Sequence, residues 1–151
     1  MFSGDPRGYY IADFSRKGVR LQYKVVGTDR RASATLSLED ELVINAYGGS
    51  SDAKVKVRLH GKGWQECIRD ERIAPESQAV IDFNLSKDRD YKRAHREEFI
   101  PMLRLRSEHI WVLPAAGSLK PGDRIKIRYS DPQMRFLTKC TVRTQEELYI
   151  R

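Results

Sequence analysis

The sequence feature that most constrains the fold is the strict alternation of basic and aliphatic residues from Lys54 to His60. Side chains alternate between the two sides of an extended strand, so the three aliphatic residues would point one way and the four basic ones the other. The segment therefore predicts a β-strand with one buried face and one cationic face.

Similar short segments recur along the chain, separated by turns such as Lys120-Pro-Gly-Asp123. Many short strands with turns between them favour a mainly β (α+β) fold, an antiparallel β-barrel or sandwich. Besides 54–60, we expect strands over 9–14, 19–26, 34–38, 42–47, 78–85, 102–106, 109–113, 124–129, 136–143 and 147–150.

Helical signals are fewer. Ser86 is a suitable N-cap with acidic residues after it, which predicts one long helix near residues 86–100, ending before Pro101. A short helix is predicted near residues 64–73, ending before Pro75.

The chain has 151 residues, a length typical of one domain. We expect a flexible tail over residues 1–8 and a single basic β-rich domain over 9–151, with a possible sub-boundary near residue 100. The N-terminus lacks the basic-then-apolar order of a secretory signal, and no stretch approaches about 18 apolar residues. These features predict a cytoplasmic protein with no membrane span. Cys67 and Cys140 are expected to be reduced thiols, although a single bridge between them stays open.

The charge of the chain is strongly positive, with 28 Lys and Arg against 21 Asp and Glu. The predicted strands 19–26, 54–60, 102–106, 124–129 and 136–143 together carry twelve Lys and Arg and no acid. Like charges opposite each other on neighbouring strands destabilise a sheet. Two interpretations follow: either these strands lie on different faces, or their cations converge into a platform for a phosphate-bearing partner.

The second interpretation predicts a non-enzymatic module that binds nucleic acid, DNA or RNA, chiefly through its phosphates. Trp64 follows a flexible Gly-Lys-Gly turn, so it would either stack on a base or lie in the core. An acidic protein is the alternative partner. The predicted binding residues are Lys54, Lys56, Arg58, Lys62, Trp64, Arg124, Lys126 and Arg128.

A second hypothesis comes from a short motif. Residues 13–18, Asp-Phe-Ser-Arg-Lys-Gly, resemble the Asp-x-Ser-x-x-Gly motif of the PilZ family of cyclic di-GMP-binding β-barrels, and residues 80–89 resemble the last strand and helix of such domains. The resemblance spans residues 9–98. It implies that Asp13, Ser15 and Gly18, with Arg7 upstream, help to hold a cyclic dinucleotide. The family's upstream Arg-x-x-x-Arg motif is missing, since Arg7 alone is available.

Catalytic patterns are sparse in this sequence. The three histidines lack metal-ligand spacing, and there is no phosphate-binding glycine loop or nucleophile elbow. A Mg²⁺-dependent nuclease arrangement can be written from Asp40, Asp52 and Lys54. The leading hypothesis remains a protein with no enzymatic activity, no metal site and no cofactor.

Overall fold

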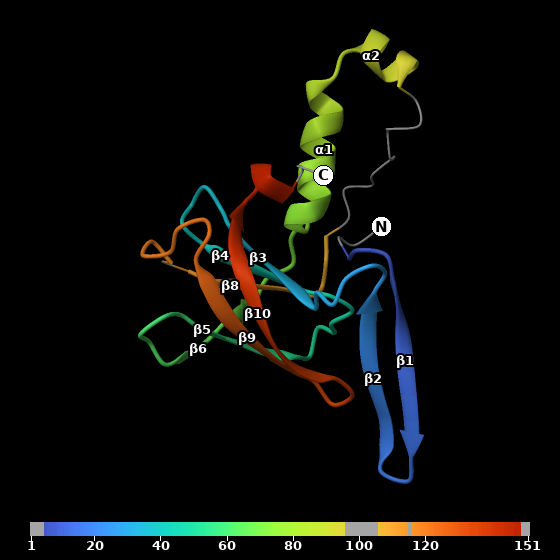
Figure 1. Ribbon diagram of the computed structural model, residues 1–151, viewed down its shortest axis with the longest axis vertical. Helices are drawn as coiled ribbons and strands as arrows, with labels where there is room; N and C mark the ends of the chain where they lie inside the picture. The colour runs from blue at the N-terminus through green and yellow to red at the C-terminus, as the bar shows by residue number, and fades with distance from the viewer. Residues whose placement is uncertain (1–4, 96–105, 115, 149–151) are drawn as a thin grey trace.

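The computed structural model describes residues 5–95, 106–114 and 116–148 (Figure 1). Strands β1 (Gly8–Ser15) and β2 (Gly18–Val25) form a separate hairpin. The other strands form one eight-stranded sheet. They are β3 (Ala32–Leu36), β4 (Leu42–Ala46), β5 (Lys54–Arg58), β6 (Trp64–Glu66), β7 (Ile68–Arg69), β8 (Ile110–Leu113), β9 (Arg124–Ser130) and β10 (Arg135–Thr144).

Two short helices, α1 (Pro75–Ser86) and α2 (Arg89–Ala94), follow β7, and a 3₁₀ turn, η2 (Glu146–Leu148), follows β10. Figure 1 shows α1 and the hairpin projecting from the sheet in opposite directions. Neither helix in the described part of the chain combines the length and apolarity needed to cross a lipid bilayer.

The large sheet curls into a nearly closed barrel. Its strand order is β6-β5-β9-β10-β3-β4-β8-β7, so the two edge strands are consecutive in the chain. Only Cys67 lies between them, and its N–H donates to the carbonyl of Val55, 2.9 Å away. All neighbouring pairs are antiparallel except β10 with β3, which is parallel over three residues. The expected mainly β fold is thus confirmed, with one parallel pair in a sheet that was predicted to be antiparallel.

The inner side of the barrel is filled by the aliphatic half of the alternating strands. Val55 and Val57 of β5 and Ile125 and Ile127 of β9 are buried to within 2% exposure. Tyr129 stacks on Phe136, with ring centroids 4.9 Å apart, and meets the edge of Trp111 at 5.9 Å. Because odd-numbered residues of β5 and β9 form this core, their even-numbered residues point outward.

The predicted helix near residues 64–73 is wrong, because this segment forms the two edge strands. Trp64–Glu66 pairs with β5, and Ile68–Arg69 pairs with β8. The segment has a composition that suits a helix, but the barrel requires extended backbone here to bring its two edges together. Tertiary pairing overrides a weak local propensity in such a case.

The two other helix-related predictions also need correction. Residues 78–85, predicted as a strand, lie in α1, which has Pro75 in its first turn and Glu76 beside it, both favourable at a helix start. Ser86 ends α1 instead of capping a long helix over 86–100. Asp88 caps the short α2, accepting from the N–H of Tyr91 at 2.7 Å. Residues 96–105 lie outside the described residues, as does most of the predicted strand 102–106. The predicted strand 147–150 is replaced by η2 as far as Leu148.

The first described residues are held against the body of the domain. The Tyr23 hydroxyl donates to the carbonyl of Pro6 at 2.7 Å, and the Val26 N–H donates to that of Arg7 at 2.8 Å. Asp5 lies 3.3 Å from His109, which precedes β8. Residues 1–4 of the expected tail lie outside the described residues.

Candidate functional site

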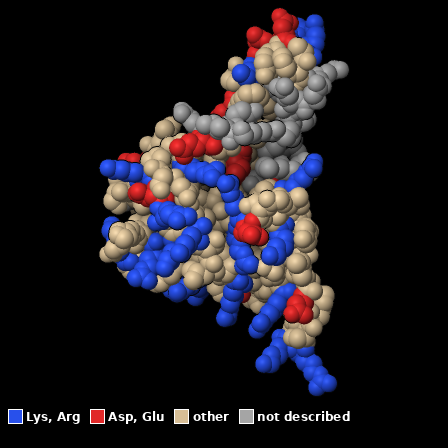
Figure 2. Space-filling model, viewed as in Figure 1, with Lys and Arg blue, Asp and Glu red and all other residues tan. Residues whose placement is uncertain are grey.

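The outward side of β5, β9 and β10 carries a dense group of cations, which we call the cationic face. It comprises Lys54, Lys56 and Arg58 of β5, Arg124, Lys126 and Arg128 of β9, and Arg135 and Lys139 of β10. All are exposed except Lys56, which is half-buried. Figure 2 shows Lys and Arg crowding the viewed surface, with few Asp or Glu among them.

The strand registers place these cations directly opposite one another. Arg58 pairs with Lys126, and Lys126 pairs with Lys139, so three cations lie in one row across three strands. Lys56 pairs with Arg128 in the next row. Directly opposite residues point to the same side of an antiparallel sheet with Cβ atoms about 4.5–5.5 Å apart. The face therefore brings like charges into the closest positions a sheet offers.

Among the described residues, no carboxylate forms an ion pair with this face. The four ion pairs found among the described residues involve Arg69, Arg72 and His109, and none involves a residue of the cationic face. Glu66 of β6 lies opposite Lys56 in the register, but the two form no ion pair. A hollow of about 440 Å³ lies at one end of the face, lined by Arg58, Arg124, Lys126, Lys139 and neighbouring residues.

Trp64 borders the cationic face instead of joining the core. It lies opposite Arg58 in the β5–β6 pair, is half-buried, and has the guanidinium carbon of Arg128 4.1 Å from its ring centroid. This is a close cation–π contact. Arg58 Nε donates to the carbonyl of Lys62 at 3.3 Å, which ties the exposed β5–β6 loop to the same edge.

Seven of the twelve strand cations therefore meet on one face, together with the predicted Lys62 and Trp64 beside it. Arg20 and Lys24 lie on the hairpin, Arg106 precedes β8, and Arg143 lies further along β10. Arg104 is outside the described residues. Arg135 was missed because the predicted strand began at Phe136. The alternation of exposed residues from 135 to 141 is the signal that includes it.

The residues of the dinucleotide hypothesis form a hairpin turn. Ser15 Oγ accepts from the N–H of Lys17 at 3.2 Å and donates to the carbonyl of Gly18 at 3.4 Å. Gly18 has φ of +119°, a conformation that favours glycine. Asp13 pairs with Arg20 across the hairpin, and Arg7 lies just before β1. The Asp-x-Ser-x-x-Gly spacing is thus accounted for by the geometry of a two-residue turn.

The residues of the nuclease arrangement are not brought together. Asp40 lies in the turn before β4, whereas Asp52 lies in the loop after it, where it accepts from Ser50 Oγ. The five-residue strand between them spans about 16 Å. Within the described ranges, no group of three or more His, Cys, Asp or Glu is placed to hold a metal ion.

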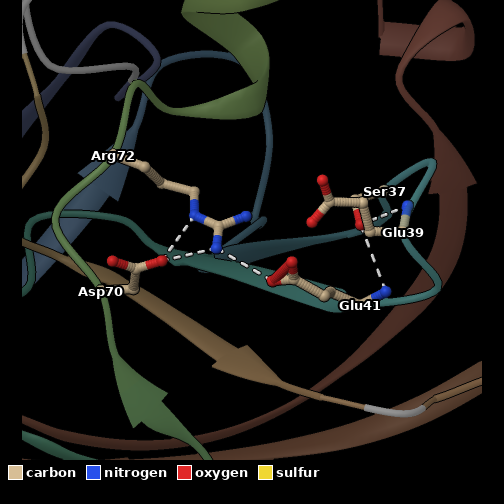
Figure 3. A network of polar contacts seen from close by, with 5 residues as sticks. All are labelled: Ser37, Glu39, Glu41, Asp70 and Arg72. Carbon is tan, nitrogen blue, oxygen red and sulfur yellow. Dashed lines mark hydrogen bonds and ion pairs between the residues drawn. The ribbon is translucent and has the colours of Figure 1, made fainter.

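The acidic turn around Asp40 has a structural role (Figure 3). Ser37 Oγ accepts from the N–H groups of Glu39 and Glu41, both at 3.2 Å. Arg72 donates to Glu41 at 2.9 Å and, through Nε, to Asp70 at 2.9 Å. The two hydrogen-bonded carboxylates raise the pKa of Arg72 against the opposing effect of burial. This network ties the β3–β4 turn to the segment that follows β7.

A second polar network lies where α1 meets the barrel. Glu76 accepts from Asn45 Nδ2 at 3.0 Å, from Tyr47 at 3.4 Å and from Ser33. Asn45 Oδ1 lies 2.9 Å from His109 Nδ1, and the other ring nitrogen faces Asp5. Burial raises the pKa of Asp5 to about 7 and lowers that of His109. Both pKa shifts favour the uncharged forms of Asp5 and His109.

The fold and its surface define a basic β-barrel domain with an unneutralised cationic face. The model of the MetallophosC family, the C terminal of calcineurin-like phosphoesterase, matches residues 1–135. The chain belongs to this family. No curated protein and no solved structure matches the chain significantly. The PilZ resemblance is therefore wrong, since the family match covers the whole region from which it was drawn.

Proposed function

We propose that this domain is a non-enzymatic module that binds nucleic acid, with the cationic face contacting the phosphate backbone. The observation that supports the proposal is the row formed by Arg58, Lys126 and Lys139, three like charges in register that form no ion pair with any described carboxylate. An anion placed over this row relieves its repulsion and replaces small counterions.

The dimensions of the face suit a polyanion. Arg124, Lys126 and Arg128 are spaced two residues apart along β9, which extends them over about 13 Å. The three strands add about 10 Å in the perpendicular direction. Such an area contacts several phosphates at once. Lysine and arginine side chains that reach phosphates position a nucleic acid without reading its sequence.

Trp64 adds a contact that bases can use. Its ring lies at the margin of the face and is covered on one side by Arg128. Aromatic rings stack on bases of any sequence. The family assignment is compatible with this role, because a phosphoesterase acts on phosphate esters and an accessory domain that gathers phosphate-bearing chains would retain them nearby.

The test is a fluorescence-anisotropy titration of the chain with labelled duplex DNA, single-stranded DNA and RNA over a range of salt concentrations. Lys126→Gln and Arg58→Gln should weaken binding to every sequence by a similar factor. Each should also reduce the slope of log affinity against log salt by about 1. Lys24→Gln, which removes one charge from a strand outside the face, is the matched control.

Equal effects of Lys24→Gln and Lys126→Gln would mean that net charge, and not this face, determines binding. No binding of any nucleic acid at low salt would overturn the proposal. In that case the purified chain should be analysed by gel filtration with and without nuclease, because an acidic protein bound to the same face survives the nuclease treatment.

A further inference from the structure

A second cationic site lies outside the cationic face, where β3 and β10 separate. The two strands pair only over Val142–Thr144, so β10 before residue 142 diverges from residues 30–33. The gap forms a cavity of about 370 Å³. This volume falls in the range of about 300–1,000 Å³ that small-molecule sites occupy. The lining residues include Arg30, Arg31, Tyr47, Glu76, Lys139 and Arg143.

Two arginines of this cavity are available for an anion. Arg30 and Arg143 both lie near the Cys140 thiol, whose pKa burial raises to about 11 against the opposing effect of these two cations. Neither guanidinium forms an ion pair within the described part of the chain. Arg31 is engaged differently, because its guanidinium carbon lies 5.8 Å from the ring centroid of Phe136. Both guanidiniums line the cavity, Arg30 from the segment before β3 and Arg143 from β10, and charge-assisted hydrogen bonds from either suit a phosphate group.

Glu76 adds a carboxyl group to the otherwise cationic lining of the cavity. Among the described lining residues it is the one acid, and it is held in place by Ser33, Asn45 and Tyr47. The two carboxyl oxygens have four lone pairs, and they accept from Ser33, Tyr47, Asn45 and the N–H of Glu76 itself, so that a ligand hydroxyl would share an oxygen that already accepts one of these bonds. As the acid of this lining, Glu76 is the acceptor that a ligand hydroxyl meets. A dianion such as free phosphate gains nothing from this carboxyl group.

We infer that this cavity binds a small sugar- or polyol-phosphate monoester, with the phosphate on Arg30 and Arg143 and a hydroxyl on Glu76. The inference is independent of nucleic-acid binding, since Arg30, Arg143 and Glu76 are not part of the cationic face. Of the described residues, Lys139 is the one that lines both this cavity and the hollow on the face, so its substitution is expected to affect both ligands.

The experiment is calorimetric titration of the whole chain with ribose 5-phosphate, ribose and inorganic phosphate. Ribose 5-phosphate should bind at least about tenfold more tightly than either of the other two, because it alone satisfies both ends of the site. Arg30→Gln and Arg143→Gln should each weaken its binding by about tenfold or more, as expected for the loss of a charge-assisted hydrogen bond. Glu76→Gln should reduce the preference for ribose 5-phosphate over inorganic phosphate.

Lys24→Gln on the hairpin is the control of equal charge change, and it should leave ribose 5-phosphate binding unchanged. Arg30 is exposed, so its substitution does not threaten folding. Thermal melts monitored by circular dichroism check the other variants. Absence of ribose 5-phosphate binding at millimolar concentration overturns the inference, as does binding that Arg30→Gln and Arg143→Gln leave intact. Equal affinity for inorganic phosphate overturns the assignment of an ester. Titrations of the same proteins with duplex DNA show whether the cationic face binds nucleic acid, independently of the result for this cavity.

Discussion

Replacing Lys126 by threonine should stabilise the domain at low salt. Lys126 is the central residue of a three-cation row, directly opposite Arg58 on one side and Lys139 on the other. It is exposed and makes no ion pair among the described residues. Removing its charge therefore removes two repulsive pairs and breaks no attractive one.

The size of the effect follows from the geometry of the row. Long side chains on directly opposite positions can splay, which places the charges about 8 Å apart in water and gives about 0.5 kcal/mol of repulsion per pair. Two pairs give about 1 kcal/mol. The Debye length falls from about 30 Å at 0.01 M salt to about 3 Å at 1 M, so high salt should nearly abolish this contribution.

The assay is urea unfolding of wild type and Lys126→Thr at both salt concentrations. Threonine also favours a strand, which adds an increment that does not depend on salt. Lys24→Thr measures that increment, because Lys24 lies opposite Tyr9 and has no cation across the hairpin. We expect the difference between Lys126→Thr and wild type to shrink by about 1 kcal/mol from low to high salt. A difference that does not change with salt would refute the reasoning that the row stores electrostatic repulsion.

Four further outcomes are expected. Burial raises the folded-state pKa of Asp5 from 3.8 to about 7, so the folded state holds the proton of Asp5 more tightly than the unfolded state. The stability that this proton contributes is present below pH 4 and is lost as the pH rises to 7. Asp5→Asn should therefore raise the unfolding free energy by up to about 4 kcal/mol at pH 8, and by much less at pH 4. Ile127→Ala should cost about 2–5 kcal/mol in urea unfolding, because Ile127 is fully buried. Trp64 emission should change when an oligonucleotide binds, whereas Trp111, 1% exposed, should not respond; a Trp111→Phe variant isolates the signal. Arg72→Met should cost about 1–2 kcal/mol in thermal unfolding, since it removes a partly buried tether between two loops.

Strands with one solvent-exposed face and one buried face could be predicted from the sequence. The alternation in 54–60 and 124–129 identified β5 and β9 and separated their core residues from their outward cations. The prediction succeeds because strict alternation of apolar and charged residues fits an extended strand with one buried and one exposed face. The hairpin around residues 15–18 was also predictable, because Ser and Gly are residues that favour turns through their own local conformation.

The errors fall where local sequence is ambiguous and the rest of the fold decides. The segment 78–85, in which five of eight residues are apolar, suits a strand or a partly buried helix equally, and Pro75 at the helix start was the signal that could have separated them. Trp64–Arg69 is extended because it closes the barrel, a requirement that no six-residue window contains. The cavity between β3 and β10 was equally hidden, because the parallel pairing of Val142–Thr144 with Ala34–Leu36 joins segments more than 100 residues apart in the chain.

The register of the core explains why the like charges cannot separate. Val57 lies opposite Ile127 inside the barrel, and this pairing places Arg58 opposite Lys126 outside it. Sliding β9 by one residue would turn its cations into the core, at a cost far above the repulsion of a surface row. The chain therefore cannot relieve the row by changing its fold. Three ways of reducing the repulsion remain: splaying of the side chains, screening by dissolved salt, and binding of an anion. Of these, a bound chain of phosphates is the one that neutralises all three positions together.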